Sequence, residues 1–118
     1  MSAENYLMDI KQSDRRIGEL VRLQTMMAGT PAPNEQIARD RAALEEQITR
    51  SYQDNLSERK RAQRFIDRLP DPVERQALTL FYLRHLTCDE AAEIMGFTAR
   101  QLYRVKRRAL MHLEGLLL

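Results

Sequence analysis

Four prolines occur in the chain, in two close pairs, and each pair must interrupt any helix that approaches it. Pro31 and Pro33 lie in the segment 29–34, which begins with a glycine, and a proline ring breaks or kinks a helix interior. Pro70 and Pro72 form the second break, because a proline also disfavours helical geometry at the residue before it. The chain of 118 residues is therefore expected to fold as three separate segments.

The two segments before the second break both have the pattern of amphipathic helices. Apolar residues recur at helical spacing from about residue 4 to residue 28, and again from residue 35 to residue 69. Because a short connection joins them, the two helices are expected to form an antiparallel, coiled-coil-like hairpin over residues 1–69. The apolar stripe of the longer helix needs more partner surface than one helix provides. This unmet need for partner surface favours a homodimer. The alternative is a monomer whose hairpin folds back on its own C-terminal half.

A new helix is expected to start at the second proline break. Asp71 has a side chain suited to capping, Pro72 suits the first helical position, and Glu74 stands where a capping box requires an acidic residue. This helix is expected to run across residues 73–84.

Two further capping boxes follow, TCDE at residues 87–90 and TARQ at residues 98–101. The first opens a short helix and the second opens a long one. Gly96 lies between them, where a left-handed conformation is easiest for glycine. A short helix, a glycine turn and a longer helix are typical of the helix-turn-helix arrangement. The sequence therefore predicts an all-α protein in which a helix-turn-helix domain, residues 70–118, follows the hairpin.

The second helix of this motif carries five Lys or Arg residues and, until near its end, no Asp or Glu. At 100° per residue, Leu102 and Val105 define a buried side, and Arg100, Arg104 and Arg107 then lie on the opposite side. Arginines spaced three and four residues apart repel one another unless an anion meets them. The alternative is an ordinary solvated face, but such a face normally contains acidic residues as well. The bare basic face therefore favours double-stranded DNA as the partner.

The N-terminal turns of a recognition helix, here about residues 98–115, point into the major groove. Arg100 and Arg104 would each form a bidentate bond to guanine, and Gln101 would read adenine unless its capping box holds it. Tyr103 would contact a thymine methyl group or a sugar, or else serve in packing.

The remaining candidates suit the DNA backbone. Thr98 and the free N–H groups at the helix start suit a phosphate. Arg107, Arg108 and Lys106 lie further along the helix, where phosphate contacts set position rather than sequence. The complete set of candidate DNA-binding residues is Thr98, Arg100, Gln101, Tyr103, Arg104, Lys106, Arg107 and Arg108.

These residues resemble region 4 of the sigma-70 family of bacterial transcription initiation factors. The matching stretch, residues 69–116, reads LPDPVERQALTLFYLRHLTCDEAAEIMGFTARQLYRVKRRALMHLEGL. The resemblance implies that the groove-reading positions fall on Ala99, Arg100, Tyr103 and Arg104. Ala99 and Tyr103 stand where the housekeeping factors carry arginines, so their promoter specificity does not transfer. Because region 4 also docks on RNA polymerase, the resemblance adds the polymerase as a second partner to be considered.

The whole chain is similar to the RinA/ArpU type of late-gene transcriptional regulators, which are small phage and prophage proteins. These combine an N-terminal helical hairpin, beginning with a YL…I…D.RI pattern, with a sigma-region-4-like end. Here the pattern lies within residues 6–17, YLMDIKQSDRRI, and the later stretch RQLYRVKRRAL is also similar. The resemblance implies a sequence-specific DNA-binding transcriptional regulator.

Other classes of function find less support. The two histidines, His85 and His112, lack the Cys or carboxylate cluster of a metal site, and no glycine-rich phosphate loop occurs. We therefore expect no catalytic residues, no metal and no cofactor. Two alternatives stay open. One is an interaction protein that docks on RNA polymerase; the other is a phage packaging protein of the small-terminase type, which also joins a helix-turn-helix to oligomerising helices.

Composition and targeting signals indicate where the protein acts. Cys88 is the only cysteine, so no intramolecular disulfide can form and a reducing compartment is expected. No apolar run approaches the ~18 residues of a membrane span, and the start of the chain lacks the basic-then-apolar order of a signal peptide. A cytoplasmic protein without membrane contact is expected.

Overall fold

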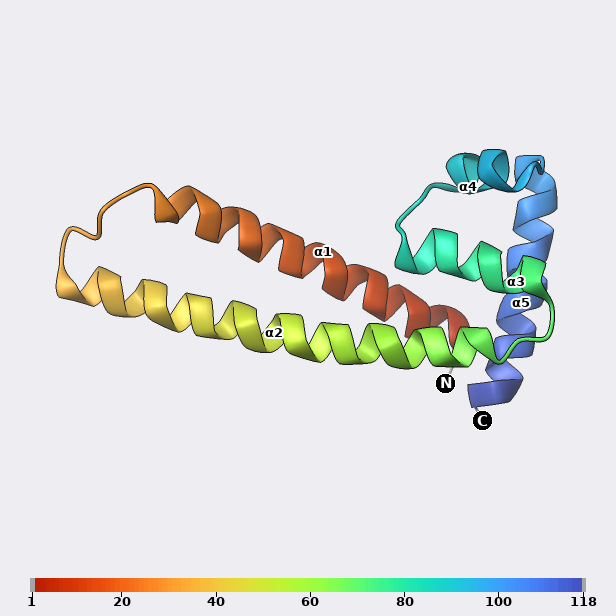
Figure 1. The fold of residues 1–118 in the computed structure, drawn as a ribbon, viewed down its shortest axis with the longest axis horizontal. Helices are drawn as coiled ribbons and strands as arrows, with labels where there is room; N and C mark the ends of the chain where they lie inside the picture. The colour runs from red at the N-terminus through yellow and green to blue at the C-terminus, as the bar shows by residue number, and fades with distance from the viewer. Residues whose placement is uncertain (1, 118) are drawn as a thin grey trace. The chain divides into compact units, whose positions relative to one another are not determined.

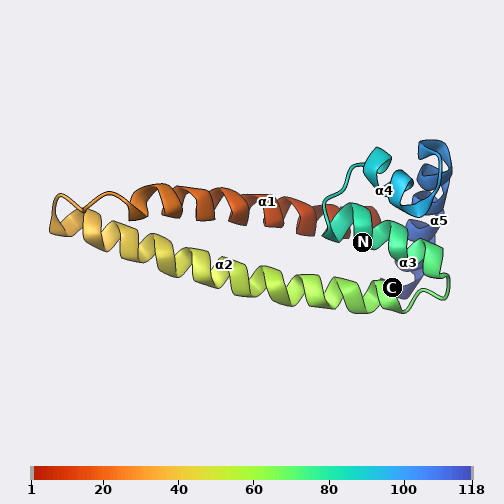
Figure 2. The same cartoon turned by 45° about the horizontal axis from the view of Figure 1, so that its top comes forward.

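The computed structural model describes residues 2–117, and these residues form helices, turns and loops without a β-strand. The helices are α1 (Ala3–Ala28), α2 (Glu35–Asp67), α3 (Pro72–Leu78), η1 (Thr79–Leu83), α4 (Cys88–Met95) and α5 (Ala99–Leu117), as Figures 1 and 2 show. The predicted all-α fold is confirmed. The breaks between α1 and α2 and between α2 and α3 fall at the two proline pairs.

The contacts within the chain divide it into two compact units. The hairpin unit is Gln12–Ser57, and the C-terminal unit contains the start of α1 up to Lys11 together with the residues from Glu58 onward. The first turns of α1 and the last turns of α2 therefore belong to the same unit as α3, η1, α4 and α5.

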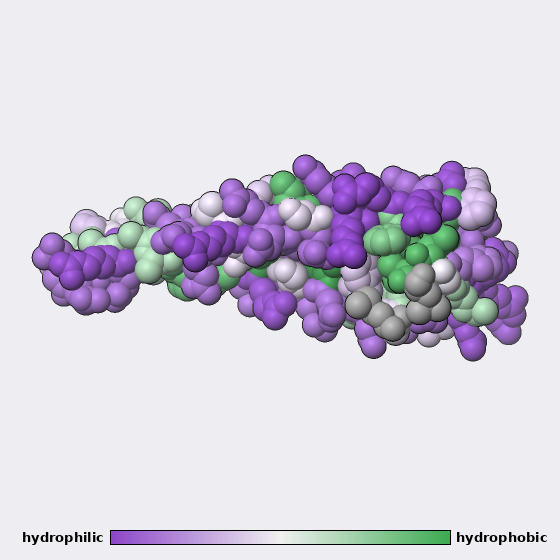
Figure 3. Space-filling view, turned by 90° about the horizontal axis from the view of Figure 1, so that it is seen from below, coloured by the Kyte–Doolittle hydropathy of each residue, from purple (hydrophilic) through white to green (hydrophobic). Residues whose placement is uncertain are grey.

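The hairpin unit consists of two antiparallel helical segments, one from α1 and one from α2 (Figures 1 and 2). Among residues 12–57, the buried hydrophobic side chains are Ile17 and Ile48. Polar contacts also join the two helices, because the Nδ2 atom of Asn55 donates to Asp14 at 2.5 Å and to the Ser13 hydroxyl at 3.5 Å. Figure 3 shows hydrophilic side chains over most of the visible surface of this unit, with smaller apolar patches between them. Packing within the unit is therefore sparse.

The main core lies in the C-terminal unit and draws on four parts of the chain: the start of α1, the end of α2, α3 with η1, and the second half of α5. Its buried residues are Ala3, Leu7, Ile10, Ala62, Ile66, Leu69, Leu78, Tyr82, Leu83, Ala109 and Leu113. Burial of several large aliphatic side chains, each contributing about 1.5–3 kcal/mol, anchors the second half of α5. The first half of α5 is left to pack against α4.

The third helix differs from the expected one in its final turn. It is α-helical only as far as Leu78 and continues as the π-helical η1, in which the N–H of Arg84 donates to the carbonyl of Thr79 at 3.0 Å. Hydrogen bonding between residues five apart widens the turn. The wider turn brings Leu83 to the same side as Leu78, so both side chains are buried in one core.

The start of the third helix also differs in one respect from the capping box predicted for it. The side chain of Asp71 accepts a hydrogen bond from the N–H of Val73 at 2.8 Å, and Pro72 occupies the first turn, as expected. Glu74, however, is only 1% exposed, and its carboxylate contacts His112 on α5 instead of the backbone before the helix. The capping role predicted for Glu74 is wrong, because a buried carboxylate is stabilised most by the donors that α5 supplies.

Tyr82 provides a test of this core. Its side chain is fully buried, and its hydroxyl has no hydrogen-bond partner among the described residues. Burial, the largest cause, raises the pKa of this hydroxyl. A buried polar group without a partner costs about 1–3 kcal/mol. We therefore expect Tyr82→Phe to leave the free energy of unfolding unchanged or to raise it by about 1 kcal/mol, measured by urea denaturation. A clear loss of stability would contradict this account of the hydroxyl.

Candidate nucleic-acid interface

The short helix α4 is defined at both ends by its own residues. Thr87 and Glu90 form the predicted capping box, in which the N–H of Glu90 bonds to the Thr87 hydroxyl at 3.2 Å and the N–H of Thr87 bonds to the Glu90 carboxylate at 3.1 Å. The hydrogen bond from the Thr87 backbone lowers the pKa of Glu90. The helix ends at Gly96, whose φ of 71° is left-handed and therefore suits glycine.

The long helix α5 starts three residues later, after the turn that Gly96 begins. The N–H of Gln101 bonds to the Thr98 hydroxyl at 3.1 Å, and the N–H of Thr98 bonds to the Gln101 side-chain oxygen at 2.9 Å. This is the predicted capping box. Because Gln101 uses its amide oxygen here, it can form a bidentate contact to adenine only by releasing the cap. The Thr98 hydroxyl keeps its own proton available for a phosphate oxygen.

A small second core holds α4 against the first half of α5. Its buried residues are Ala77, Ala91, Ala92, Leu102 and Val105, with Met95 and Phe97 packed against them. The small side chains of Ala91 and Ala92 allow the two helices to approach closely. The elements α4, the turn at Gly96 and α5 therefore form a helix-turn-helix, and its second helix has a fixed rotation about its axis.

That rotation places the basic face outward. Arg100, Arg104 and Arg107 are exposed, while Leu102 and Val105 on the other side of the helix are buried. Within residues 2–117, no carboxylate forms an ion pair with any of these three arginines. Their guanidinium groups are available to an external anion.

Lys106 and Tyr103 lie beside this face but differ in exposure. The ammonium group of Lys106 lies 3.9 Å from the centre of the Phe81 ring and 5.3 Å from that of Tyr103. Cation–π contacts of this kind contribute about 0.5–1 kcal/mol at exposed sites and hold the ammonium group toward the protein. The Tyr103 side chain is 59% exposed. Of these two candidates, Tyr103 is the more accessible to DNA.

Arg108 differs from the other arginines of α5 because Glu74 of α3 and Asp71, which caps that helix, hold it. Its guanidinium group lies 3.6 Å from the Glu74 carboxylate and 4.0 Å from that of Asp71. The Glu74 carboxylate also contacts the Nδ1 atom of His112 at 2.6 Å. Arg108 can reach a phosphate only in competition with these carboxylates. Arg108 and His112 are four residues apart in the sequence. This spacing places both on the side of α5 that meets α3.

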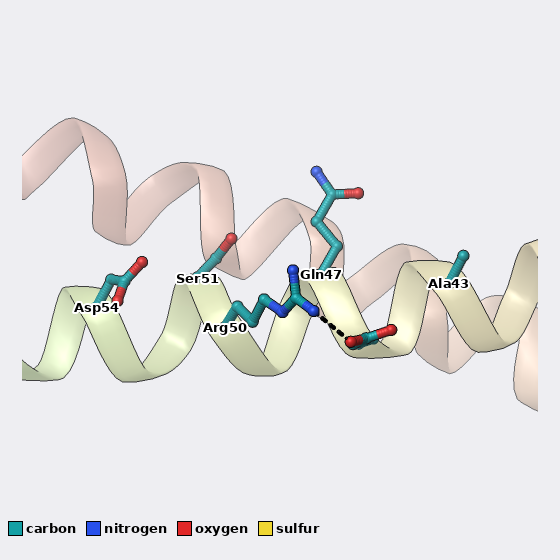
Figure 4. A pocket seen from close by; sticks show the side chains of 6 residues that line it. Ala43, Gln47, Arg50, Ser51 and Asp54 are labelled. Carbon is teal, nitrogen blue, oxygen red and sulfur yellow. Dashed lines mark hydrogen bonds and ion pairs between the residues drawn. The ribbon is translucent and has the colours of Figure 1, made fainter.

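Figure 4 shows a hollow in the hairpin unit that carries no comparable chemistry. It is lined by Ala43, Glu46, Gln47, Arg50, Ser51 and Asp54 of α2. Its arginine is already paired, because Arg50 lies 2.5 Å from Glu46. The hollow is the side of one helix rather than a site in which several elements converge.

Two further kinds of site are absent from the part of the chain that the structure describes. Residues 2–117 contain no group of three or more His, Cys, Asp or Glu side chains arranged to hold a metal ion. None of the helices formed by these residues combines the length and the apolar character needed to cross a bilayer.

The fold and this face define an all-α protein whose helix-turn-helix presents an unpaired basic side. Comparison with protein families assigns the chain further. The model of the family described as protein of unknown function (DUF1492) matches residues 24–114, so the chain belongs to that family. Neither a curated protein nor a solved structure matches it.

Proposed function

We propose that the protein is a sequence-specific, double-stranded-DNA-binding transcriptional regulator of the phage and prophage RinA/ArpU type, with α5 as its recognition helix. One observation carries the proposal. Arg100, Arg104 and Arg107 project from the second helix of a helix-turn-helix without a carboxylate partner among residues 2–117. Like charges at this spacing repel one another in the free protein. Binding of an anion relieves this repulsion, which adds to the free energy of binding.

The position of each arginine along α5 suggests its role. Arg100 and Arg104 lie in the first two turns, which a recognition helix inserts into the major groove. A bidentate bond from either to guanine O6 and N7 would contribute about 1–3 kcal/mol of discrimination against other bases. Arg107 lies one turn further and suits a backbone phosphate, as does Thr98 at the helix start.

The hairpin unit supports a homodimer as the DNA-binding form. Exposed apolar side chains remain on both of its helices, including Met26 on α1 and Tyr52 and Leu56 on α2, which are 75%, 54% and 39% exposed. Tyr52 and Leu56 are one helical turn apart and therefore share a face. A single DNA-binding module buries only about 600–1,000 Å² of protein surface, so pairing two modules would supply the affinity that one lacks.

In vitro selection of duplexes bound by the full chain tests the proposal. We expect a defined motif, repeated with two-fold symmetry because a symmetric dimer presents two α5 helices. Binding should weaken with salt, by about 0.9 in log K per unit of log salt for each phosphate contacted. Recovery of unrelated sequences after repeated rounds would contradict sequence-specific binding.

The dimer has its own test. Replacing Tyr52 and Leu56 with glutamate places charges on the shared apolar face, and we expect light scattering to report the 13.8 kDa monomer where the unchanged protein gives a dimer. The control is Ile94→Glu, which changes an apolar side chain of α4 that is 59% exposed and should leave the dimer intact. Equal dissociation in both variants would contradict pairing through the hairpin, and a ring of many subunits would favour a packaging role.

A further inference from the structure

A second basic cluster lies on the last turns of α2 and the turn that follows. Arg61, Arg64 and Arg68 surround Phe65 in a shallow hollow that these four residues line. The guanidinium carbons of Arg61 and Arg68 lie 5.8 Å and 5.9 Å from the centre of the Phe65 ring. Cation–π attraction to one ring gathers the two guanidinium groups despite their mutual repulsion. The hollow therefore presents several donors around an aromatic surface.

These arginines, like Arg100, Arg104 and Arg107 of α5, are not neutralised by the protein. Across residues 2–117, no carboxylate forms an ion pair with Arg61, Arg64 or Arg68. The nearby Asp67 accepts a hydrogen bond from Gln63 at 2.9 Å. The C-terminal unit as a whole has 13 Lys or Arg against 10 Asp or Glu, whereas the hairpin unit has 6 against 7. The positive charge of the protein is thus carried by the unit that contains α5.

An unused donor lies beside the same arginines. The Tyr6 ring packs edge-on against Phe65, with 6.4 Å between ring centres, and its buried hydroxyl has no partner among the described residues. Burial and then Glu58 raise the pKa of this hydroxyl, while Arg61 and Arg64 act in the opposite direction. An unpaired buried donor is costly. If the arginines shifted slightly and an oxyanion bound between them, that oxyanion could accept a hydrogen bond from the Tyr6 hydroxyl and remove this cost.

The cluster and the recognition residues lie toward opposite ends of α5. In both ribbon views α5 begins beside α4 and ends beside the last turns of α2 (Figures 1 and 2). Its 19 residues span about 28 Å at 1.5 Å per residue. A duplex that met both places would have to extend well past the bases that Arg100 and Arg104 read.

We infer that the hollow formed by Arg61, Arg64, Phe65 and Arg68 binds backbone phosphates of the same duplex, outside the segment read by α5. The inference rests on the proposed function and adds a second contact to it. Guanidinium groups suit phosphate because they present paired donors in a fixed plane and stay charged. A polyanion already held by α5 would be the nearest source of such oxygens, which favours DNA over an acidic protein segment.

Binding to duplexes of two lengths tests the inference. The variant carries Arg61→Gln, Arg64→Gln and Arg68→Gln, and the duplexes share one central sequence but span about one and a half or about four helical turns. On the long duplex we expect the slope of log K against log salt to shrink by about 2–3, since each lost phosphate contact removes about 0.9. The short duplex should bind both proteins with the same slope. The matched control replaces Arg15, Arg16 and Arg22 of the hairpin unit with glutamine and should change neither slope.

Several outcomes would overturn the inference. One is an equal change on both duplexes, and another is no change on either. A third is retained binding of long DNA together with lost binding of polyglutamate, which would assign the hollow to an acidic protein. Arg64→Glu repeats the test without disturbing the two guanidinium groups packed on Phe65. The proposed function fails separately: if Arg100→Ala with Arg104→Ala leaves binding to the short duplex unchanged, α5 is not the DNA-reading helix, whatever the hollow does.

Discussion

Replacing Arg104 with alanine is expected to abolish most of the preference of the protein for its selected duplex over a scrambled one. Arg104 is exposed in the second turn of α5, one helical turn from Arg100, and no acidic residue of the described chain pairs with it. Loss of a bidentate contact to guanine removes about 1–3 kcal/mol of discrimination, which is roughly a 5- to 150-fold change. Competition between the two duplexes, followed by fluorescence anisotropy, measures this ratio directly.

The matched control is Arg107→Ala on the same face of α5. Arg107 is also exposed but lies further from the start of the helix, where a phosphate contact is expected. This variant should weaken binding to both duplexes by the same factor and reduce the salt slope by about 0.9. If Arg104→Ala also weakened both duplexes equally, Arg104 would contact the backbone and not a base.

Leu102→Ala is expected to destabilise the protein more than any substitution on the basic face. Leu102 is 1% exposed and lies in the small core that joins α4 to α5. Truncation of a buried leucine to alanine costs about 2–5 kcal/mol, from lost transfer free energy and the cavity left behind. A domain is stable by only about 5–15 kcal/mol, so the urea midpoint should fall substantially.

The control for Leu102→Ala is Met111→Ala in the same helix. Met111 is 67% exposed, so its truncation removes few contacts and should change the free energy of unfolding by no more than about 0.5 kcal/mol. Both variants introduce alanine, which has a high helix propensity. The two substitutions therefore differ mainly in how buried the replaced side chain is. Similar destabilisation by the two substitutions would contradict the burial assigned to α5.

The elements that could be predicted from the sequence are those defined by local chemistry. The capping boxes that start at Thr87 and Thr98 involve residues three apart, and both sets of hydrogen bonds are present. The turn at Gly96 depends on a left-handed φ that glycine adopts without strain. The outward direction of Arg100 and Arg104 follows from helical periodicity once the buried side of α5 is known.

The features that sequence reasoning missed all depend on contacts between distant residues. Glu74 fits a local capping pattern, yet its carboxylate contacts His112, 38 residues away. The same carboxylate holds Arg108, so one of the predicted phosphate contacts is partly engaged within the protein. The hollow around Phe65 was also missed, because Glu58 and Asp67 lie close to its arginines in the sequence, and only the folded structure shows that neither pairs with them.

A duplex titration observed at the arginine side chains tests the central claim most directly. The Nε–H signals of Arg100 and Arg104 are followed by NMR as the selected duplex is added to the full chain, with Arg39 of the hairpin unit, which pairs with Glu35 at 3.4 Å, as the internal reference. We predict that both α5 signals shift on addition of DNA, that the shifts reverse as salt is raised, and that the Arg39 signal stays in place. If no duplex at any salt concentration moves the signals of Arg100 and Arg104, the basic face of α5 does not meet DNA.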